Sequence, residues 1–177
     1  MSQTPSRMRL ITFFAALCLF LAAVEYAVPK PLPFLRLGLA NVPILLSLEK
    51  MRRRDTLLLV VFKVLGQGII SGTLFSYVFV FSAAGSCASA LAMLLLYAVG
   101  KKYLSAVGLS LAGALANNLA QLAVARWLLF GAHIRYIAPV LLITGLVTGL
   151  ALGICTERFK QKSRWFALLP TNAGGVL

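Results

Sequence analysis

Residues 10–28, LITFFAALCLFLAAVEYAV, decide the fold of this chain. Glu25 is the single charged residue in this run, and a helix that crosses a bilayer needs about 20 consecutive apolar residues. Pro29, Pro31 and Pro33 follow, and they end a helix because proline cannot donate the helical hydrogen bond. No small-x-small cleavage site accompanies the run, so we predict a retained first transmembrane helix rather than a cleaved signal peptide.

Five further apolar runs follow the first one along the chain. They are residues 34–48, 56–81, 85–99, 104–130 and 137–155. The second is short, which predicts a tilted or re-entrant segment, and the third is interrupted near 66–68 and at Ser71-Gly72. The pattern predicts an all-α membrane protein with a bundle of six transmembrane helices over residues 10–156. Residues 1–9 form a short N-terminus, and residues 157–177 a basic tail.

The composition excludes a water-soluble domain. Hydrophobic residues make up 60% of the 177 residues and charged residues only 12%, whereas soluble domains are about 45–50% apolar and about 25% charged. The net charge of +13 would suit a nucleic-acid partner, but the basic residues lie in short clusters between apolar runs, as in membrane loops. We therefore expect the lipid bilayer, and no nucleic acid, as a partner.

The basic clusters also predict the orientation. Cytoplasmic loops of membrane proteins are enriched in lysine and arginine. With the N-terminus inside, the inner segments hold twelve basic residues and the outer segments hold only Lys30 and Arg135. We predict that both termini are cytoplasmic, which requires an even number of crossings and fits six.

Polar side chains within the apolar runs are candidates for a ligand site, because such groups are costly at membrane depth. Most of them fall in the outer half of the predicted membrane. Together they suggest an outward-facing cavity for a small anionic or polar organic solute, since arginine binds carboxylate or phosphate through two hydrogen bonds. The candidate ligand-binding residues are Glu25, Arg36, Asn41, Asn117, Gln121 and Arg126.

A purely structural role is an open alternative for each candidate. Arg36 and Arg126 lie near enough to the interface to reach it with their charged ends, and asparagine and glutamine join helices by hydrogen bonds. Lys63 lies nearer the cytoplasmic side and faces either the protein or the inner headgroups.

A ridge of small residues marks the last run. Gly145, Gly149 and Gly153 recur every four residues and so share one helix face. Such ridges allow helices to approach closely in lipid, either within this bundle or on a partner membrane protein. The ridge is therefore the candidate docking site for a partner.

Several motifs of catalysis are missing from the sequence. There is no P-loop for ATP, and His133 is the single histidine. Asp55 is the single aspartate, so no aspartate-rich Mg²⁺–diphosphate site can be built. The three cysteines are isolated, with no CxxC spacing. We expect no metal, no cofactor and no enzymatic activity of the chain itself.

Two segments resemble a known family. Residues 31–41, PLPFLRLGLAN, and residues 113–122, GALANNLAQL, resemble two signatures of the Gx transporters, a small bacterial membrane family also labelled heptaprenyl diphosphate synthase component I. Residues 71–75 and 82–85 resemble its middle section. The likeness extends over about residues 10–155. Asn117 departs from the second signature, where family members often carry histidine.

The resemblance implies a fold similar to the S component of energy-coupling factor transporters, which are six-helix substrate-binding subunits. Such proteins dock on a transmembrane coupling subunit with ATPases. A bacterial cell membrane location follows from the same likeness. The leading hypothesis is thus a substrate-binding transporter subunit, and the alternative is a non-catalytic membrane partner in prenyl diphosphate or quinone metabolism or in flavin-based electron transfer. The synthase label alone implies an enzyme, which the single aspartate argues against.

Overall fold

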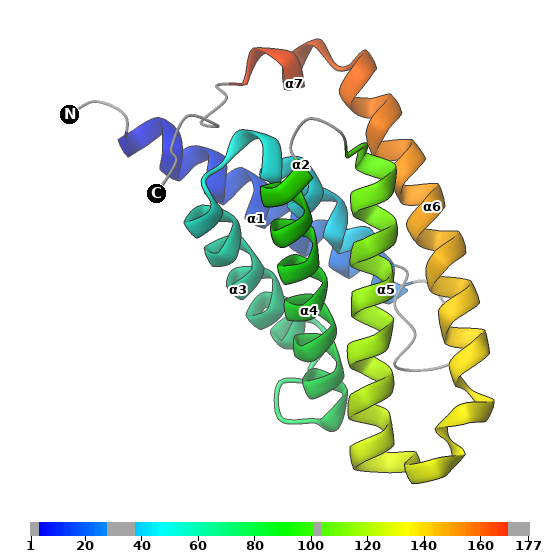
Figure 1. Cartoon of the computed structure of the whole chain (residues 1–177). Coiled ribbons are helices and arrows are strands. Elements are labelled where there is room, and N and C mark those ends of the chain that lie inside the picture. The colour runs from blue at the N-terminus through cyan, green and yellow to red at the C-terminus, as the bar shows by residue number, and fades with distance from the viewer. Residues whose placement is uncertain (1–3, 28–37, 101–103, 170–177) are drawn as a thin grey trace.

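The computed structural model describes residues 4–27, 38–100 and 104–169, and these ranges contain helices and turns but no strand (Figure 1). The longer helices are α1 (Thr4–Ala27), α2 (Val42–Lys50), α3 (Arg53–Ile70), α4 (Tyr77–Gly100), α5 (Ala106–Ala125) and α6 (Ala138–Lys162). The shorter elements are the 3₁₀-helix η1 (Leu39–Asn41), the π-helix η2 (Arg126–Phe130), the 3₁₀-helix η3 (Gly131–Tyr136) and the helix α7 (Arg164–Leu168).

Four of the described helices are long and apolar enough to cross a membrane. They are Met8–Ala27, Tyr77–Gly100, Ala106–Leu128 and Ala138–Lys162. The chain is therefore an all-α, multi-pass membrane protein. The helix α2 has only nine residues, and α3 carries four charged side chains, so the structure leaves six crossings as a prediction. The beginning of the predicted second run, residues 34–37, lies outside the described residues.

The predicted boundary between the third and fourth helices is wrong. The chain turns at Ser71-Gly72 rather than after Phe81, so α3 ends at Ile70 and α4 already begins at Tyr77. Gly72 has a φ of 64°, which favours glycine, and Ser71 Oγ donates a hydrogen bond to the Gln67 carbonyl at 2.7 Å. A left-handed glycine and a serine bonded to the preceding turn end the helix, although the flanking residues are apolar.

The sixth helix is longer than predicted, and part of the basic tail is helical. The helix α6 continues past Cys155 to Lys162, and α7 follows after Ser163, whose side chain accepts a hydrogen bond from the Phe166 backbone N–H. Phe166 is buried in the main hydrophobic core, so α7 belongs to the folded domain.

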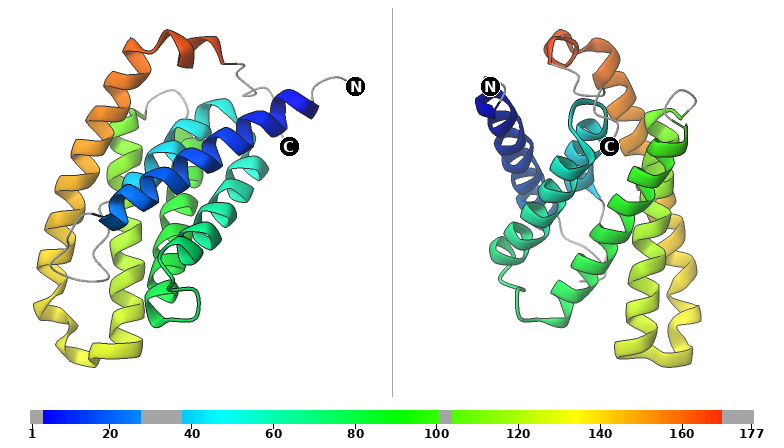
Figure 2. Two further views of the ribbon diagram at one scale, coloured as in Figure 1. Left: turned by 180° about the vertical axis from the view of Figure 1, so that it is seen from behind. Right: turned by 60° about the vertical axis from the view of Figure 1, so that its left-hand side comes forward.

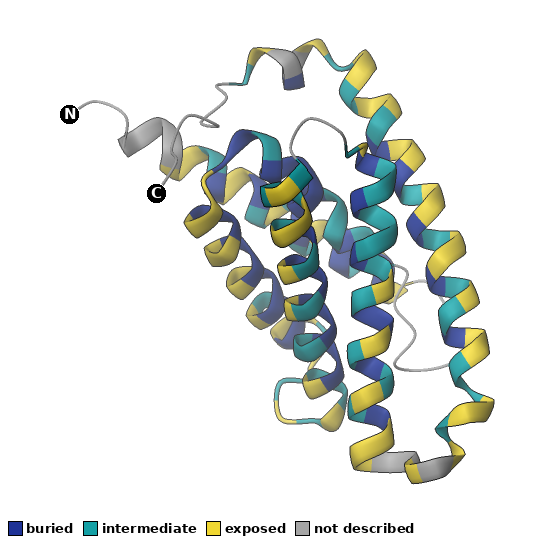
Figure 3. Ribbon diagram, in the orientation of Figure 1, coloured by how far each residue is buried: buried dark blue, intermediate teal, exposed yellow. Residues whose placement is uncertain are grey.

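The short helix α2 occupies the centre of the bundle. All residues from Pro43 to Leu48 are buried, and α2 contacts α1, α3, α4, α5 and α6. Figure 2 shows α1 and α3 on one side of the molecule and α4, α5 and α6 on the other. The outward faces of these helices are exposed and apolar, as a lipid solvent requires (Figure 3).

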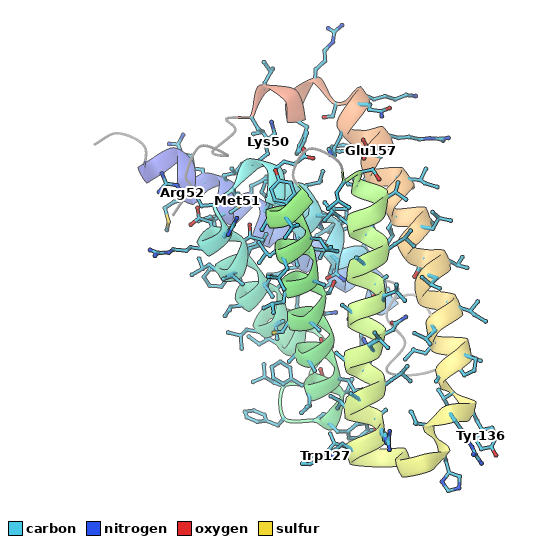
Figure 4. The ribbon with its side chains drawn as sticks, in the orientation of Figure 1. Lys50, Met51, Arg52, Trp127, Tyr136 and Glu157 are labelled. Atoms are coloured by element: carbon cyan, nitrogen blue, oxygen red, sulfur yellow. The ribbon has the colours of Figure 1, made fainter. Side chains whose placement is uncertain are left out.

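The two ends of the bundle differ in chemistry (Figure 4). One end, here called the basic end, carries Lys50, Arg52 and Glu157, and the other, here called the turn end, carries Trp127 and Tyr136. Tryptophan and tyrosine are enriched where a membrane meets water. The long axis of α4, α5 and α6 therefore follows the predicted membrane normal.

Polar contacts close the basic end. Lys160 pairs with Glu49, and Lys50 Nζ donates to the Leu169 carbonyl at 3.1 Å while lying 4.8 Å from the centre of the Phe166 ring. A carboxylate oxygen of Glu157 accepts the Ala106 backbone N–H at 2.9 Å, which caps α5 from α6. The C-terminal segment is thereby fastened to the ends of α2 and α5.

Candidate functional site

A layer of polar side chains crosses the interior of the bundle. Three helices contribute to it, and apart from Asn118 the side chains of each helix are three or four residues apart and share one face. Each of these side chains is at most 7% exposed. The members of this polar layer are Lys63 and Gln67 of α3, Ser82, Ser86 and Ser89 of α4, and Asn117, Asn118 and Gln121 of α5.

Lys63 connects three elements of this layer. Its Nζ donates hydrogen bonds to Asn41 Oδ1 of η1 at 2.6 Å and to Ser86 Oγ of α4 at 2.8 Å. The side chain is 3% exposed. Lys63 therefore faces the protein interior, which answers the question that the sequence left open.

Glycine 85 allows α4 and α5 to approach closely at the polar layer. A Cβ atom added at Gly85 would lie 2.3 Å from Asn117 Oδ1 and 3.0 Å from Gln121 Nε2. Both amides thus occupy the space that any larger side chain would fill. The glycine positions two predicted ligand-binding residues against the serine face of α4.

The neighbouring amide, Asn118, faces the other way. Asn118 Nδ2 donates to the Leu141 carbonyl of α6 at 2.8 Å, and its Oδ1 accepts from Asn117 Nδ2 at 3.4 Å. A Cβ on Gly145 would lie 1.7 Å from Asn118 Nδ2. Asn118 therefore joins α5 to α6, a structural role.

Several polar atoms of the layer have no hydrogen-bond partner among the described residues. These buried atoms are Gln67 Oε1, Ser82 Oγ, Ser89 Oγ, and Oε1 and Nε2 of Gln121. Buried polar groups in proteins nearly always have partners, and exceptions mark a site for bound water, an ion or a ligand. Their concentration in one layer indicates a place that a polar molecule can occupy.

A cavity lies beside this layer between η1, α4, α5 and α6. Its volume is about 30 Å³, and it continues into a part that is open to the outside. The polar residues of its lining are Asn41, Ser89, Ser110, Asn117, Asn118 and Thr148. Carboxylate side chains are missing from the described lining, which favours a ligand that is neutral or anionic.

The structure brings together some of the predicted site residues. Asn41 and Asn117 line the cavity, and Gln121 lies one turn further along α5, 1% exposed. Glu25 is buried near the end of α1 and does not line the cavity. Arg126 is exposed in η2 at the turn end, and Arg36 lies outside the described residues.

Sequence reasoning missed the serine face of α4 and the position of Lys63. Ser82, Gly85, Ser86 and Ser89 recur at helical spacing, and this periodicity was the available signal. The wrong start of the fourth helix hid it, because Ser82 then fell before that helix.

The glycine ridge of α6 packs against α5. Cβ atoms added at Gly149 and Gly153 would lie 2.7 Å from Ala114 Cβ and 2.8 Å from Val107 Cα. Ser110 Oγ also donates to the Gly149 carbonyl at 2.8 Å across this contact. The described structure therefore uses the ridge for internal packing, and docking of a partner on it would require α5 and α6 to separate.

The comparison with protein families matches residues 14–159 to the family described as heptaprenyl diphosphate synthase component I. The chain belongs to this family. The match runs from α1 to α6 and so covers the polar layer and the cavity. No curated protein and no solved structure matches the chain.

The described residues of this component I protein offer no metal centre. Within them, no three histidine, cysteine, aspartate or glutamate side chains lie together. The polar layer consists of amides, hydroxyls and one lysine, which donate and accept hydrogen bonds but form no carboxylate cluster for Mg²⁺. These groups can bind a ligand through hydrogen bonds.

Proposed function

We propose that the protein is the substrate-binding membrane subunit of a transporter and that it captures a small anionic or polar organic solute. One observation carries this proposal: five buried polar atoms of the polar layer have no partner in the described residues, and one of them, Ser89 Oγ, belongs to a residue that lines the cavity. In a bilayer such atoms cannot turn to bulk water, and each unsatisfied group is costly. A solute with complementary donors and acceptors removes that cost.

The proposed binding residues line the cavity or carry an unpartnered atom. Asn41, Asn117 and Gln121 belong to this set, with Ser89 of α4 added. Arg36, Arg126 and Glu25 stay ligand-binding candidates from the sequence.

The transporter would have the basic end in the cytoplasm, six crossings, and a cavity that opens outward in the cell membrane. Twelve basic residues on the inner side support this orientation. The sequence lacks a P-loop, so energy would come from a coupling subunit with ATPases. The chain itself would be non-catalytic.

Native mass spectrometry of the protein, purified gently from its own membranes, tests the proposal. We expect a retained small polar or anionic molecule and a complex that includes ATPase subunits. Gln121→Leu should lose the retained molecule. A preparation that holds neither a solute nor ATPase subunits contradicts the transporter role.

A separate observation favours a second candidate, a non-catalytic partner in prenyl diphosphate or quinone metabolism. An apolar groove with a volume of about 570 Å³ lies between α1, α2 and α6. The residues that line it include Phe13, Phe14, Leu17, Leu46 and Phe159. Such a groove would suit a prenyl chain, and the family description refers to a prenyl diphosphate synthase. A retained prenyl or quinone species with a soluble synthase, and without ATPases, would favour this role.

A further inference from the structure

The orientation of the Asn41 side-chain amide is fixed by Lys63. An amide has one acceptor oxygen and one donor nitrogen, and the lysine nitrogen is 2.6 Å from the atom assigned as Oδ1. The flipped amide would bring two donor groups into contact, which is unfavourable. The Oδ1 atom therefore faces Lys63, and the Nδ2 donor faces away from it.

The Nδ2 group of Asn41 is available to a ligand. Asn41 is half-buried, it lines the cavity, and its Nδ2 makes no hydrogen bond to another described residue. Hydrogen bonds in series polarise one another in a low-dielectric interior, so donation by Lys63 to Oδ1 strengthens Nδ2 as a donor. Lys63 thus influences hydrogen bonding in the cavity through Asn41.

Ser89 supplies a second donor in the same cavity. It is 1% exposed, its Oγ has no partner among the described residues, and it lines the cavity from α4. Gly113 of α5 leaves room for it, since a Cβ there would lie 3.0 Å from Ser89 Oγ. The hydroxyl can thus turn its proton toward a bound acceptor.

The other polar groups of the lining are already engaged as donors within the protein. Ser110 Oγ donates to the Gly149 carbonyl at 2.8 Å, and Thr148 Oγ1 donates to the Thr144 carbonyl at 2.9 Å. Asn118 Nδ2 donates to the Leu141 carbonyl at 2.8 Å. The described lining thus has two donor groups without partners, Asn41 Nδ2 and the Ser89 hydroxyl, and Lys63 polarises the first. Because the described lining has no carboxylate, it favours an anionic acceptor.

We propose that the cavity binds an oxyanion, the carboxylate or phosphate group of its ligand, through Asn41 Nδ2 and the Ser89 hydroxyl, with Lys63 as the positioning residue behind Asn41. This inference rests on the proposed function and specifies the substrate class of the same cavity. It places the recognition of charge at an asparagine rather than at the arginines that the sequence suggested.

Thermal unfolding of the protein in phosphatidylcholine nanodiscs tests the inference. The probes are sodium acetate and sodium phosphate, each against sodium chloride at equal ionic strength, with acetamide as the neutral analogue of acetate. We expect at least one oxyanion to raise the unfolding temperature, and acetamide to have no such effect. Equal stabilisation by acetamide, or none by either oxyanion, would overturn the inference.

Asn41→Asp is the decisive variant. An aspartate can pair with Lys63 and so preserve the fold, but it replaces the donor with a negative charge. We expect the apparent affinity for the stabilising oxyanion to fall by at least about tenfold, as for the loss of a hydrogen bond to a charged group. An unchanged response would overturn the role of Asn41. Ser89→Ala should weaken the response. Thr148→Val should retain it, because the Thr148 hydroxyl donates to a carbonyl of its own helix.

Two further experiments test whether Lys63 has only a structural role and whether a lipid headgroup supplies the oxyanion. Lys63→Met should abolish the preference for acetate over acetamide, a change that a purely structural lysine would not cause. In phosphatidylglycerol nanodiscs, loss of the acetate response would support oxyanion recognition with a lipid headgroup as its source. If the oxyanions fail while native mass spectrometry retains a neutral solute with ATPases, only this inference fails. If they bind and no transporter complex is found, only the proposed function fails.

Discussion

At the scale of single residues, substitution of Gln121 should raise stability while it abolishes ligand binding. Both polar atoms of its amide are buried without a partner in the described structure, so Gln121→Leu removes a desolvation cost and keeps much of the volume. We expect the variant to unfold at a higher temperature, with a gain of about 1–2 kcal/mol, and to lose the retained solute. Differential scanning fluorimetry and native mass spectrometry measure the two effects.

Asn118→Leu is the matched control on the same helix. Its Nδ2 is bonded to the Leu141 carbonyl, so the same substitution should destabilise the protein by about 1 kcal/mol. Equal changes in the unfolding temperature of Gln121→Leu and Asn118→Leu would contradict the distinction between an amide without a hydrogen-bond partner and an amide with one.

Two glycines should respond in opposite directions to alanine. Gly145→Ala places a methyl group at the position of Asn118 Nδ2 and breaks its bond to α6, which should cost about 1–3 kcal/mol. At Gly108 the nearest atoms lie at 3.6 Å or more, so Gly108→Ala should stabilise α5 by about 0.5–1 kcal/mol. Thermal unfolding in one detergent compares both variants, and a stable Gly145→Ala protein would contradict the close contact of α5 and α6.

At the scale of elements, the prediction concerns α7. Phe166 is 4% exposed and contacts Lys50 and Phe159, so Phe166→Ala should destabilise the protein by about 3 kcal/mol. Leu168 is 84% exposed, and Leu168→Ala should change stability by less than about 0.5 kcal/mol. Limited proteolysis after Lys162 reports release of α7. Equal cleavage of both variants would show that α7 is not anchored through Phe166.

The elements also show what the sequence could predict. Long apolar runs identified α1, α4, α5 and α6, because lipid imposes a length and a composition that few other structures share. The turn at Ser71-Gly72 was visible only as an interruption. Its end-of-helix role depends on a local conformation, a left-handed φ at Gly72, that hydropathy does not register.

The site was predictable to a smaller extent for a related reason. Asn41, Asn117 and Gln121 were found because polar groups stand out in apolar runs. Lys63 was placed at the headgroups as an alternative, and its contact with Asn41 joins residues 22 positions apart. Such pairing depends on how η1, α3 and α4 pack, which a pattern along one helix does not contain.

At the scale of the whole molecule, the prediction is the orientation in the membrane. In a background without the native cysteines, the His133→Cys thiol at the turn end should react with a membrane-impermeant reagent added outside intact cells. The Lys162→Cys thiol, at the end of α6 beyond Glu157, should react only after permeabilisation. The reverse labelling pattern would place the cavity and both termini on the opposite sides.

The buried lysine of α3 bears on how the chain enters the membrane during synthesis. A lysine at the centre of a lone helix costs about 2.5–3.5 kcal/mol on insertion scales. One of its acceptors, Asn41, precedes α3 in the chain, and the other, Ser86, emerges from the ribosome only with α4. With the six predicted crossings, release of α3 from the translocon into lipid is favoured once α4 has followed, and the two helices would enter the bilayer as a hairpin. A stop in translation before Ser86 should leave α3 beside the translocon, where crosslinking can detect it.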